Sequence, residues 1–130
     1  ASLLHSTIWN YSASNTHEGG DSWNTEDLSI YSSTTGEGRA VHGFSRPYAP
    51  AVSGTPLEMR FDAKTGFFEL VWDAVPGETE VYVPAHWYPR GMDTSEISSG
   101  LHVREDRDAQ RMYVESGVSG TMRIRLCPRV

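Results

Sequence analysis

Residues 57–72 decide the fold, and they read LEMRFDAKTGFFELVW. Apolar side chains alternate with other residues over 57–61 and again over 68–72, which is the period of a β-strand with one buried face. The alternating apolar residues are Leu57, Met59, Phe61, Phe68, Leu70 and Trp72. The segment 62–66 between them ends in Gly66, which suits the positive-φ position of a tight turn. The stretch therefore predicts a β-hairpin.

Further short strands follow the hairpin and are separated by Pro and Gly. They fit residues 79–83, 101–105, 110–115 and 121–126. In the last of these, Met122, Ile124 and Leu126 fall on one face of the strand, and two arginines fall on the other. Six such strands predict a small antiparallel β-sandwich.

The N-terminal part has a different pattern. Residues 3–9 are typical of a short buried strand, and residues 26–32 of the beginning of a helix, which Asp21 or Ser22 could cap. A strand, a long polar loop and a helix make one βα unit, whereas a complete barrel needs about 250 residues. The pattern therefore predicts a mainly β fold, in which a C-terminal antiparallel β-sandwich is preceded by one βα unit.

The loop between the expected strand and helix combines indoles, amides and carboxylates with few aliphatic residues. An indole covers the C–H face of a sugar ring, while amides and carboxylates provide directional hydrogen bonds. This composition favours a carbohydrate-binding rim. Its candidate residues are Trp9, Asn10, Asn15, Asp21, Trp23 and Asn24.

Together with this loop, the segments 46–48 (Arg-Pro-Tyr), 52–56 (Val-Ser-Gly-Thr-Pro), 61–70 and 79–84 resemble the C-terminal part of glycoside hydrolase family 5. The similar branch cleaves glycolipids and comprises endoglycoceramidases and fungal relatives that act on steryl β-glucosides and glucosylceramide. The resemblance implies that residues 1–45 are the last strand, loop and helix of a (β/α)8 glycosidase barrel. Residues 46–130 would be the β-sandwich domain, packed on its own catalytic barrel.

The same resemblance implies a function. The chain would be the C-terminal portion of a retaining β-glycosidase that hydrolyses the O-glycosidic bond of a steryl β-glucoside or of glucosylceramide. Such enzymes use two carboxyl groups about 5–5.5 Å apart, and the family places both on earlier barrel strands. No catalytic residue is therefore assigned here, and the fragment alone is expected to be inactive. The acidic residues Glu18, Asp21, Glu26 and Asp27 are interpreted as loop-solvating or helix-capping.

Trp9 matches the Trp that ends the last barrel strand in the family, where its ring forms the floor of the sugar subsite. Its alternative role is core packing. For the other rim candidates, side chains that bond their own turns are the alternative. Trp87 and Tyr88, in an aromatic and Pro-rich segment, are expected to be exposed and to contact lipid or a membrane surface. A buried plug between domains is the alternative for this pair.

Composition excludes several other functions. A net charge of −6 with dispersed basic residues argues against nucleic-acid binding. The five His residues show no ligand spacing, so no metal and no cofactor are expected. No apolar run reaches the roughly 20 residues that span a bilayer, although peripheral membrane contact stays open. The single Cys127 favours an intracellular location, cytoplasmic or on an internal membrane. A non-catalytic carbohydrate- or lipid-binding sandwich is the alternative function.

Overall fold

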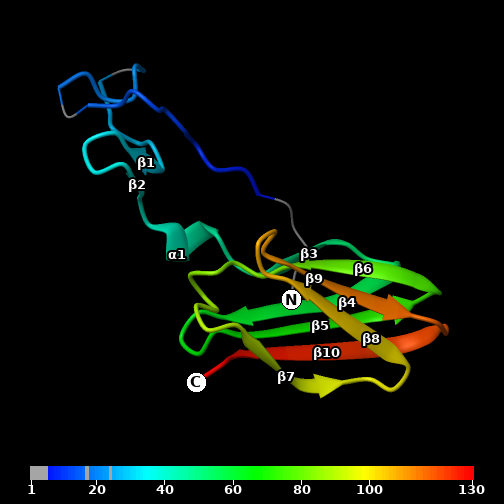
Figure 1. Ribbon diagram of the computed structural model, residues 1–130. Coiled ribbons are helices and arrows are strands. Elements are labelled where there is room, and N and C mark those ends of the chain that lie inside the picture. The colour runs from blue at the N-terminus through cyan, green and yellow to red at the C-terminus, as the bar shows by residue number, and fades with distance from the viewer. Residues whose placement is uncertain (1–5, 17, 24) are drawn as a thin grey trace. The chain divides into compact units, whose positions relative to one another are not determined.

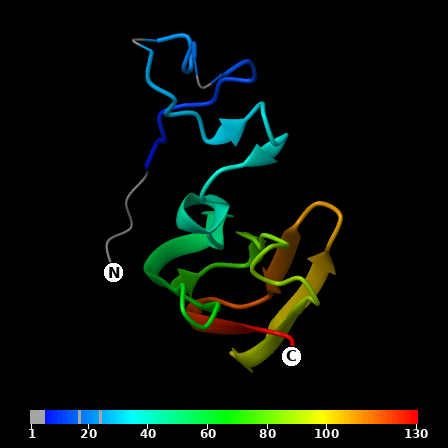
Figure 2. The same ribbon diagram turned by 90° about the vertical axis from the view of Figure 1, so that its left-hand side faces the viewer.

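A computed structural model describes residues 6–16, 18–23 and 25–130. The chain divides into two compact units, with the boundary between Ser45 and Arg46. Each unit is shown as a ribbon in Figure 1 and, turned by 90°, in Figure 2. The assignment of these units to a barrel end and a sandwich domain stays a prediction.

The larger unit contains eight strands in two antiparallel sheets. The first sheet has the order β4-β5-β10-β7, and the second has the order β3-β6-β9-β8. The strands are β3 (Tyr48–Ala51), β4 (Gly54–Asp62), β5 (Phe67–Ala74), β6 (Gly77–Tyr82), β7 (Met92–Ile97), β8 (Leu101–Asp106), β9 (Arg111–Ser116) and β10 (Gly120–Pro128). The predicted β-sandwich is thus confirmed (Figure 1).

The core lies between the two sheets and is built by the alternation that the sequence shows. The first sheet contributes Phe68, Leu70 and Trp72 from β5, with Ile124 and Leu126 from β10. The second sheet adds apolar residues of β6 and β9, which are Val81, Met112 and Val114. Burying each large apolar side chain contributes about 1.5–3 kcal/mol, so these strands carry most of the unit's stability.

The predicted hairpin is confirmed. Strands β4 and β5 pair antiparallel, and Phe61 faces Phe68 in their register. Gly66 has a φ of 72° and donates its backbone N–H to the Asp62 carbonyl oxygen at 2.8 Å. The Asp62 carboxylate accepts from the Lys64 N–H and the Thr65 hydroxyl, both at 2.9 Å. The turn is therefore closed by its own side chains.

Two strands, β3 and β7, were not predicted from the sequence. β7 pairs with β10 across a register shift at Arg125/Leu126, and its residues after Met92 are exposed. β3 pairs with β6 and presents only Ala49 as a half-buried residue. Both lie at sheet edges, where backbone pairing fixes the strand without an alternating apolar pattern.

The smaller unit corrects two expectations. Its described residues form β1 (Tyr31–Ser32), β2 (Glu37–Gly38) and α1 (Val41–Phe44). The expected strand over residues 3–9 falls partly on residues outside the described ones, and residues 6–9 form no strand. A barrel strand gains its backbone hydrogen bonds from neighbouring parallel strands, and the described sheets contain antiparallel pairs.

The helix expected from Glu26 is wrong, and so is its cap at Asp21 or Ser22. In a helix the Ile30 N–H would bond the Glu26 carbonyl oxygen. Instead, the Ile30 N–H donates to the Asn10 carbonyl oxygen at 2.8 Å, and the Glu26 carbonyl oxygen accepts from the Asp21 N–H at 2.7 Å. Polar side chains also compete for the backbone in this segment, and no apolar layer covers a helix face.

Candidate functional site

Asp21 organises the N-terminal loop. Its carboxylate accepts a hydrogen bond from the Asn10 side-chain amide at 2.7 Å and another from the Trp23 backbone N–H at 3.1 Å. Its own N–H is bonded to Glu26, so both ends of the residue are fixed. One buried carboxylate thereby joins the residue after Trp9 to Trp23.

Trp9 and Trp23 form an aromatic pair. Their ring centroids lie 6.2 Å apart, and their planes are inclined by 73°. This is the edge-to-face geometry that aromatic pairs prefer. Each Trp is 65% exposed, so the indoles offer apolar surface outward.

A polar acceptor lies beside Trp9. The Asn10 side chain donates to Asp21, but its Oδ1 atom is buried without a hydrogen-bond partner. A buried carbonyl oxygen without a donor costs free energy, so an internal water is its expected partner. The cluster thus combines apolar surface with one unsatisfied acceptor.

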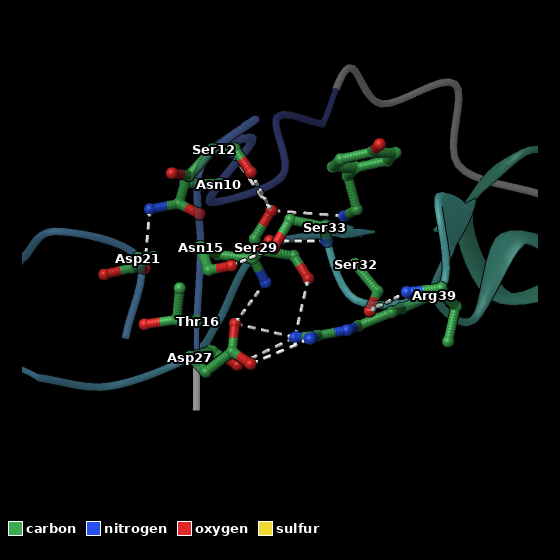
Figure 3. A network of polar contacts seen from close by, with 12 residues as sticks. Asn10, Ser12, Asn15, Thr16, Asp21, Asp27, Ser29, Ser32, Ser33 and Arg39 are labelled. Carbon is green, nitrogen blue, oxygen red and sulfur yellow. Dashed lines mark hydrogen bonds and ion pairs between the residues drawn. The ribbon is translucent and has the colours of Figure 1, made fainter. Parts of the chain in front are cut away.

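A second network holds the base of the loop (Figure 3). The Asn15 amide donates to Asp27 at 2.7 Å and its Oδ1 atom accepts from the Ser33 N–H at 2.8 Å. Arg39 donates to the other Asp27 carboxylate oxygen at 2.8 Å. The Ser29 hydroxyl accepts from the Ser12 N–H at 3.0 Å. Polar contacts therefore replace an apolar core in this unit.

The predicted rim residues accordingly divide into groups. Trp9, Asn10, Asp21 and Trp23 are brought together. Asn15 lies in the network at the base, where its amide nitrogen and its amide oxygen are both bonded to residues distant in the chain. Asn24 lies outside the described residues. Substrate contact by any of them stays a prediction.

The supporting roles of Asp27, Ser29 and Arg39 were not predicted from the sequence. The contacts that join them to the network reach residues 10 to 17 positions away in the chain. No local spacing marks such pairs. The available signal was compositional: an Asp and an Arg flank a Ser-rich segment that is poor in aliphatic residues.

Comparison with known proteins identifies the larger unit. The model for the glycoside hydrolase family 5 C-terminal domain matches residues 46–126. The chain belongs to this family. The predicted resemblance is confirmed.

The relatives of this family 5 chain are longer proteins. A glucosylceramidase of Rhizopus delemar is 31% identical over 124 residues, covering 75% of this chain and 18% of the relative. A glucosylceramidase of Cryptococcus neoformans is 24% identical over 138 residues, covering 86% and 19%. The chain therefore spans about a fifth of the length of these relatives.

Solved structures agree. Sterylglucosidase 1 of Cryptococcus neoformans matches with a TM-score of 0.77 and 25% identity, covering 94% of this chain and 22% of that structure. The aligned part of this chain is longer than the larger unit, so the alignment also includes residues of the smaller unit. Endo-glycoceramidase II of Rhodococcus sp., with a TM-score of 0.58, 24% identity and coverage of 74% of this chain and 22% of that one, shows the fold alone.

Within the family 5 domain, the expectation that Tyr88 is exposed is wrong. The residue is 4% exposed and packs in the core, and its hydroxyl donates to the Gly66 carbonyl oxygen at 2.9 Å. Satisfying the hydroxyl inside the protein permits burial of the whole ring. Trp87 is half-buried and packs edge-on against Phe61, with centroids 4.8 Å apart. Contact of Trp87 with lipid stays a prediction.

A small hollow lies beside Tyr88, lined by residues of 83–92 and 105–111, and measures about 130 Å³. Ligand pockets usually hold about 300–1,000 Å³. The hollow is therefore too small for a sugar together with a lipid, and the exposed Trp9–Trp23 pair is the better candidate.

The acidic residues of the loop have structural positions. Asp21 and Asp27 are engaged by neighbouring side chains, whereas Glu18 and Glu26 are exposed. Within the described ranges, no group of three or more His, Cys, Asp or Glu side chains is arranged to hold a metal ion. Of the helices described, none has the length and apolarity to cross a bilayer.

Proposed function

We propose that this chain is the C-terminal portion of a retaining β-glycosidase that hydrolyses the O-glycosidic bond of a glycolipid, either a steryl β-glucoside or glucosylceramide. Membership of the glycoside hydrolase family 5 C-terminal domain carries this proposal. It is supported by relatives named glucosylceramidase and sterylglucosidase, of which the chain spans about a fifth.

The two units would have separate tasks in that enzyme. Residues 46–130 form the sandwich and would pack on the catalytic barrel. Residues 1–45 would contribute the C-terminal end of that barrel. The alignment of sterylglucosidase 1 with residues of the smaller unit supports this assignment.

Trp9 would then be the floor of the sugar subsite. Its exposed indole would cover the C–H face of the sugar. Asp21 would hold Asn10 and Trp23 in place without touching the sugar. The two catalytic carboxyl groups of the retaining mechanism would come from outside residues 1–130.

The test compares residues 1–130 with the complete native polypeptide that contains them. Only the complete polypeptide should release glucose from glucosylceramide or a steryl β-glucoside. In it, Trp9→Ala should lower kcat/KM by about a hundredfold, because interactions at the reacting sugar contribute to the transition state. Activity of residues 1–130 alone, or full activity of Trp9→Ala, would refute the respective part of the proposal.

A non-catalytic binding module is the second candidate, and one feature of the second sheet favours it. Tyr48 is exposed beside Tyr82 on the outer face, with ring centroids 5.6 Å apart. However, Arg111 covers the Tyr82 ring at 4.9 Å, and Arg104 covers Tyr113 at 4.0 Å. Saturable binding of glucosylceramide vesicles by residues 46–130 that Tyr48→Ala abolishes would support this candidate.

A further inference from the structure

The smaller unit has an inverted distribution of polarity. Its buried side chains are polar, among the residues that the structure describes, and they are Asn15, Asp21, Ser29 and Ser32. Several of its large apolar residues are exposed, and they are Ile8, Trp9, Tyr11, Trp23 and Leu28. Concentrated exposed apolar surface marks a contact site. Of these residues, Trp9 and Trp23 contact each other.

The pair forms a corner with two apolar walls. Because the planes are inclined by 73°, one flat ligand ring cannot lie on both indoles. A ligand that fills the corner needs two parts that meet at an angle. A sugar joined to an apolar group through a glycosidic oxygen has such a shape.

The corner is held in place before a ligand arrives. The Asp21 carboxylate accepts from the Asn10 side-chain amide and from the Trp23 backbone N–H, so the side chain next to Trp9 and the backbone of Trp23 are tied to one buried group. Preorganised walls bind without the entropic cost of ordering a loop. A loop held by such bonds is typical of a ligand-binding site.

The two walls would take different parts of the ligand. In the proposed function the sugar lies on the Trp9 indole. The backbone N–H of Trp23 is already bonded to Asp21, and the Trp23 indole is 65% exposed. The Trp23 wall is therefore left for the apolar group.

We propose that Trp23 is a specificity-determining residue that contacts the apolar aglycone of the glycolipid while the sugar lies on Trp9. The proposal rests on the proposed glycosidase function. The Trp23 indole would supply binding that a glucoside with a small, water-soluble leaving group does not use.

The test measures kcat and KM of the complete native polypeptide on two substrates: glucosylceramide in mixed detergent micelles and para-nitrophenyl β-glucoside in buffer. Trp23→Ala should raise KM for glucosylceramide by about ten- to a hundredfold, as for loss of an apolar pocket contact. The kcat/KM for the soluble glucoside should change less than about threefold, and Trp23→Phe should restore most of the lipid activity.

Tyr11→Ala is the matched control, because Tyr11 is equally exposed in the same unit but pairs with Tyr31 instead. Tyr11→Ala should leave kcat and KM unchanged on both substrates.

An equal loss of kcat/KM on both substrates after Trp23→Ala, or no loss on either, would overturn the role of Trp23. If the wild-type polypeptide cleaves neither substrate, the proposed function itself fails. If Trp23→Ala does not fold, an intermediate, lipid-specific rise in KM for Trp23→Phe decides the question.

Discussion

The Tyr88 hydroxyl donates a hydrogen bond of 2.9 Å to the Gly66 carbonyl oxygen. It connects the aromatic segment before β7 to the turn between β4 and β5, 22 positions earlier in the chain. Tyr88→Phe should therefore lower the free energy of unfolding by about 1–2 kcal/mol, because it removes a buried hydrogen bond and leaves the carbonyl without this donor. Urea unfolding measures the change. A variant as stable as the wild type would show that the hydroxyl contributes nothing.

The same hydroxyl should give the protein a pH dependence. Burial, and to a smaller extent the nearby Cys127, raises the pKa of Tyr88 above its ordinary value. Because the folded-state pKa exceeds the unfolded one, the contribution to stability is complete below pH of about 10 and declines as pH rises further. Unfolding free energies between pH 8 and 11 should fall more steeply for the wild type than for Tyr88→Phe. Parallel curves would contradict this assignment.

Glu69 should be more important for stability than other carboxylates of the sheet. It lies on the outer face of β5 but is only 5% exposed, beneath Arg125 at 2.7 Å and Arg123 at 3.5 Å. Glu69→Gln should cost about 1–3 kcal/mol, since it leaves guanidinium groups without their shared partner. Glu96→Gln is the control: Glu96 also pairs with Arg125 but is 43% exposed, and its loss should cost less than about 1 kcal/mol. Equal effects of the two variants would refute the distinction.

Gly66 should resist replacement for two separable reasons. Its φ of 72° disfavours side chains, and a Cβ atom there would approach the Pro128 Cγ atom to 2.6 Å. Gly100 has a comparable φ of 85°, but its added Cβ would meet Val118 at an ordinary 3.5 Å. Gly100→Ala should cost about 1 kcal/mol from backbone conformation alone. Gly66→Ala should cost at least about 1 kcal/mol more, because the clash adds to it. Thermal unfolding of both variants gives the comparison.

The Asp27–Arg39 pair should hold the base of the candidate site. Arg39 contacts the Asp27 carboxylate and its backbone carbonyl, and burial of both side chains is partial. Arg39→Met should accelerate proteolysis within residues 6–40 by about two- to fivefold, since exposed pairs contribute less than about 1 kcal/mol. Arg46→Met, an exposed arginine of the larger unit, is the control and should leave the rate unchanged. If Arg39→Met leaves the proteolysis rate unchanged, the other hydrogen bonds of the loop hold it in place.

The sequence by itself determined the sandwich and the hairpin of β4 and β5. Alternation at Phe68, Leu70 and Trp72 places one face of β5 in the core because successive side chains of a strand point to opposite sides. Gly66 and Asp62 encode their turn locally. The family resemblance was also available from short segments, as the match to residues 46–126 confirms.

Only the tertiary structure decided the rest, because those features depend on partners distant in the chain. β7 is a strand through backbone pairing with β10, and its exposed residues carry no alternating pattern. Tyr88 is buried because the Gly66 carbonyl oxygen accepts a hydrogen bond from its hydroxyl, and no local sequence pattern predicts this contact. The segment after Glu26 is not helical, since its backbone bonds reach back to Asp21 and Asn10. The aromatic corner likewise exists because Asp21 joins Asn10 to Trp23 across the loop. Local alternation therefore specified the sheets, whereas long-range hydrogen bonds specified the candidate site.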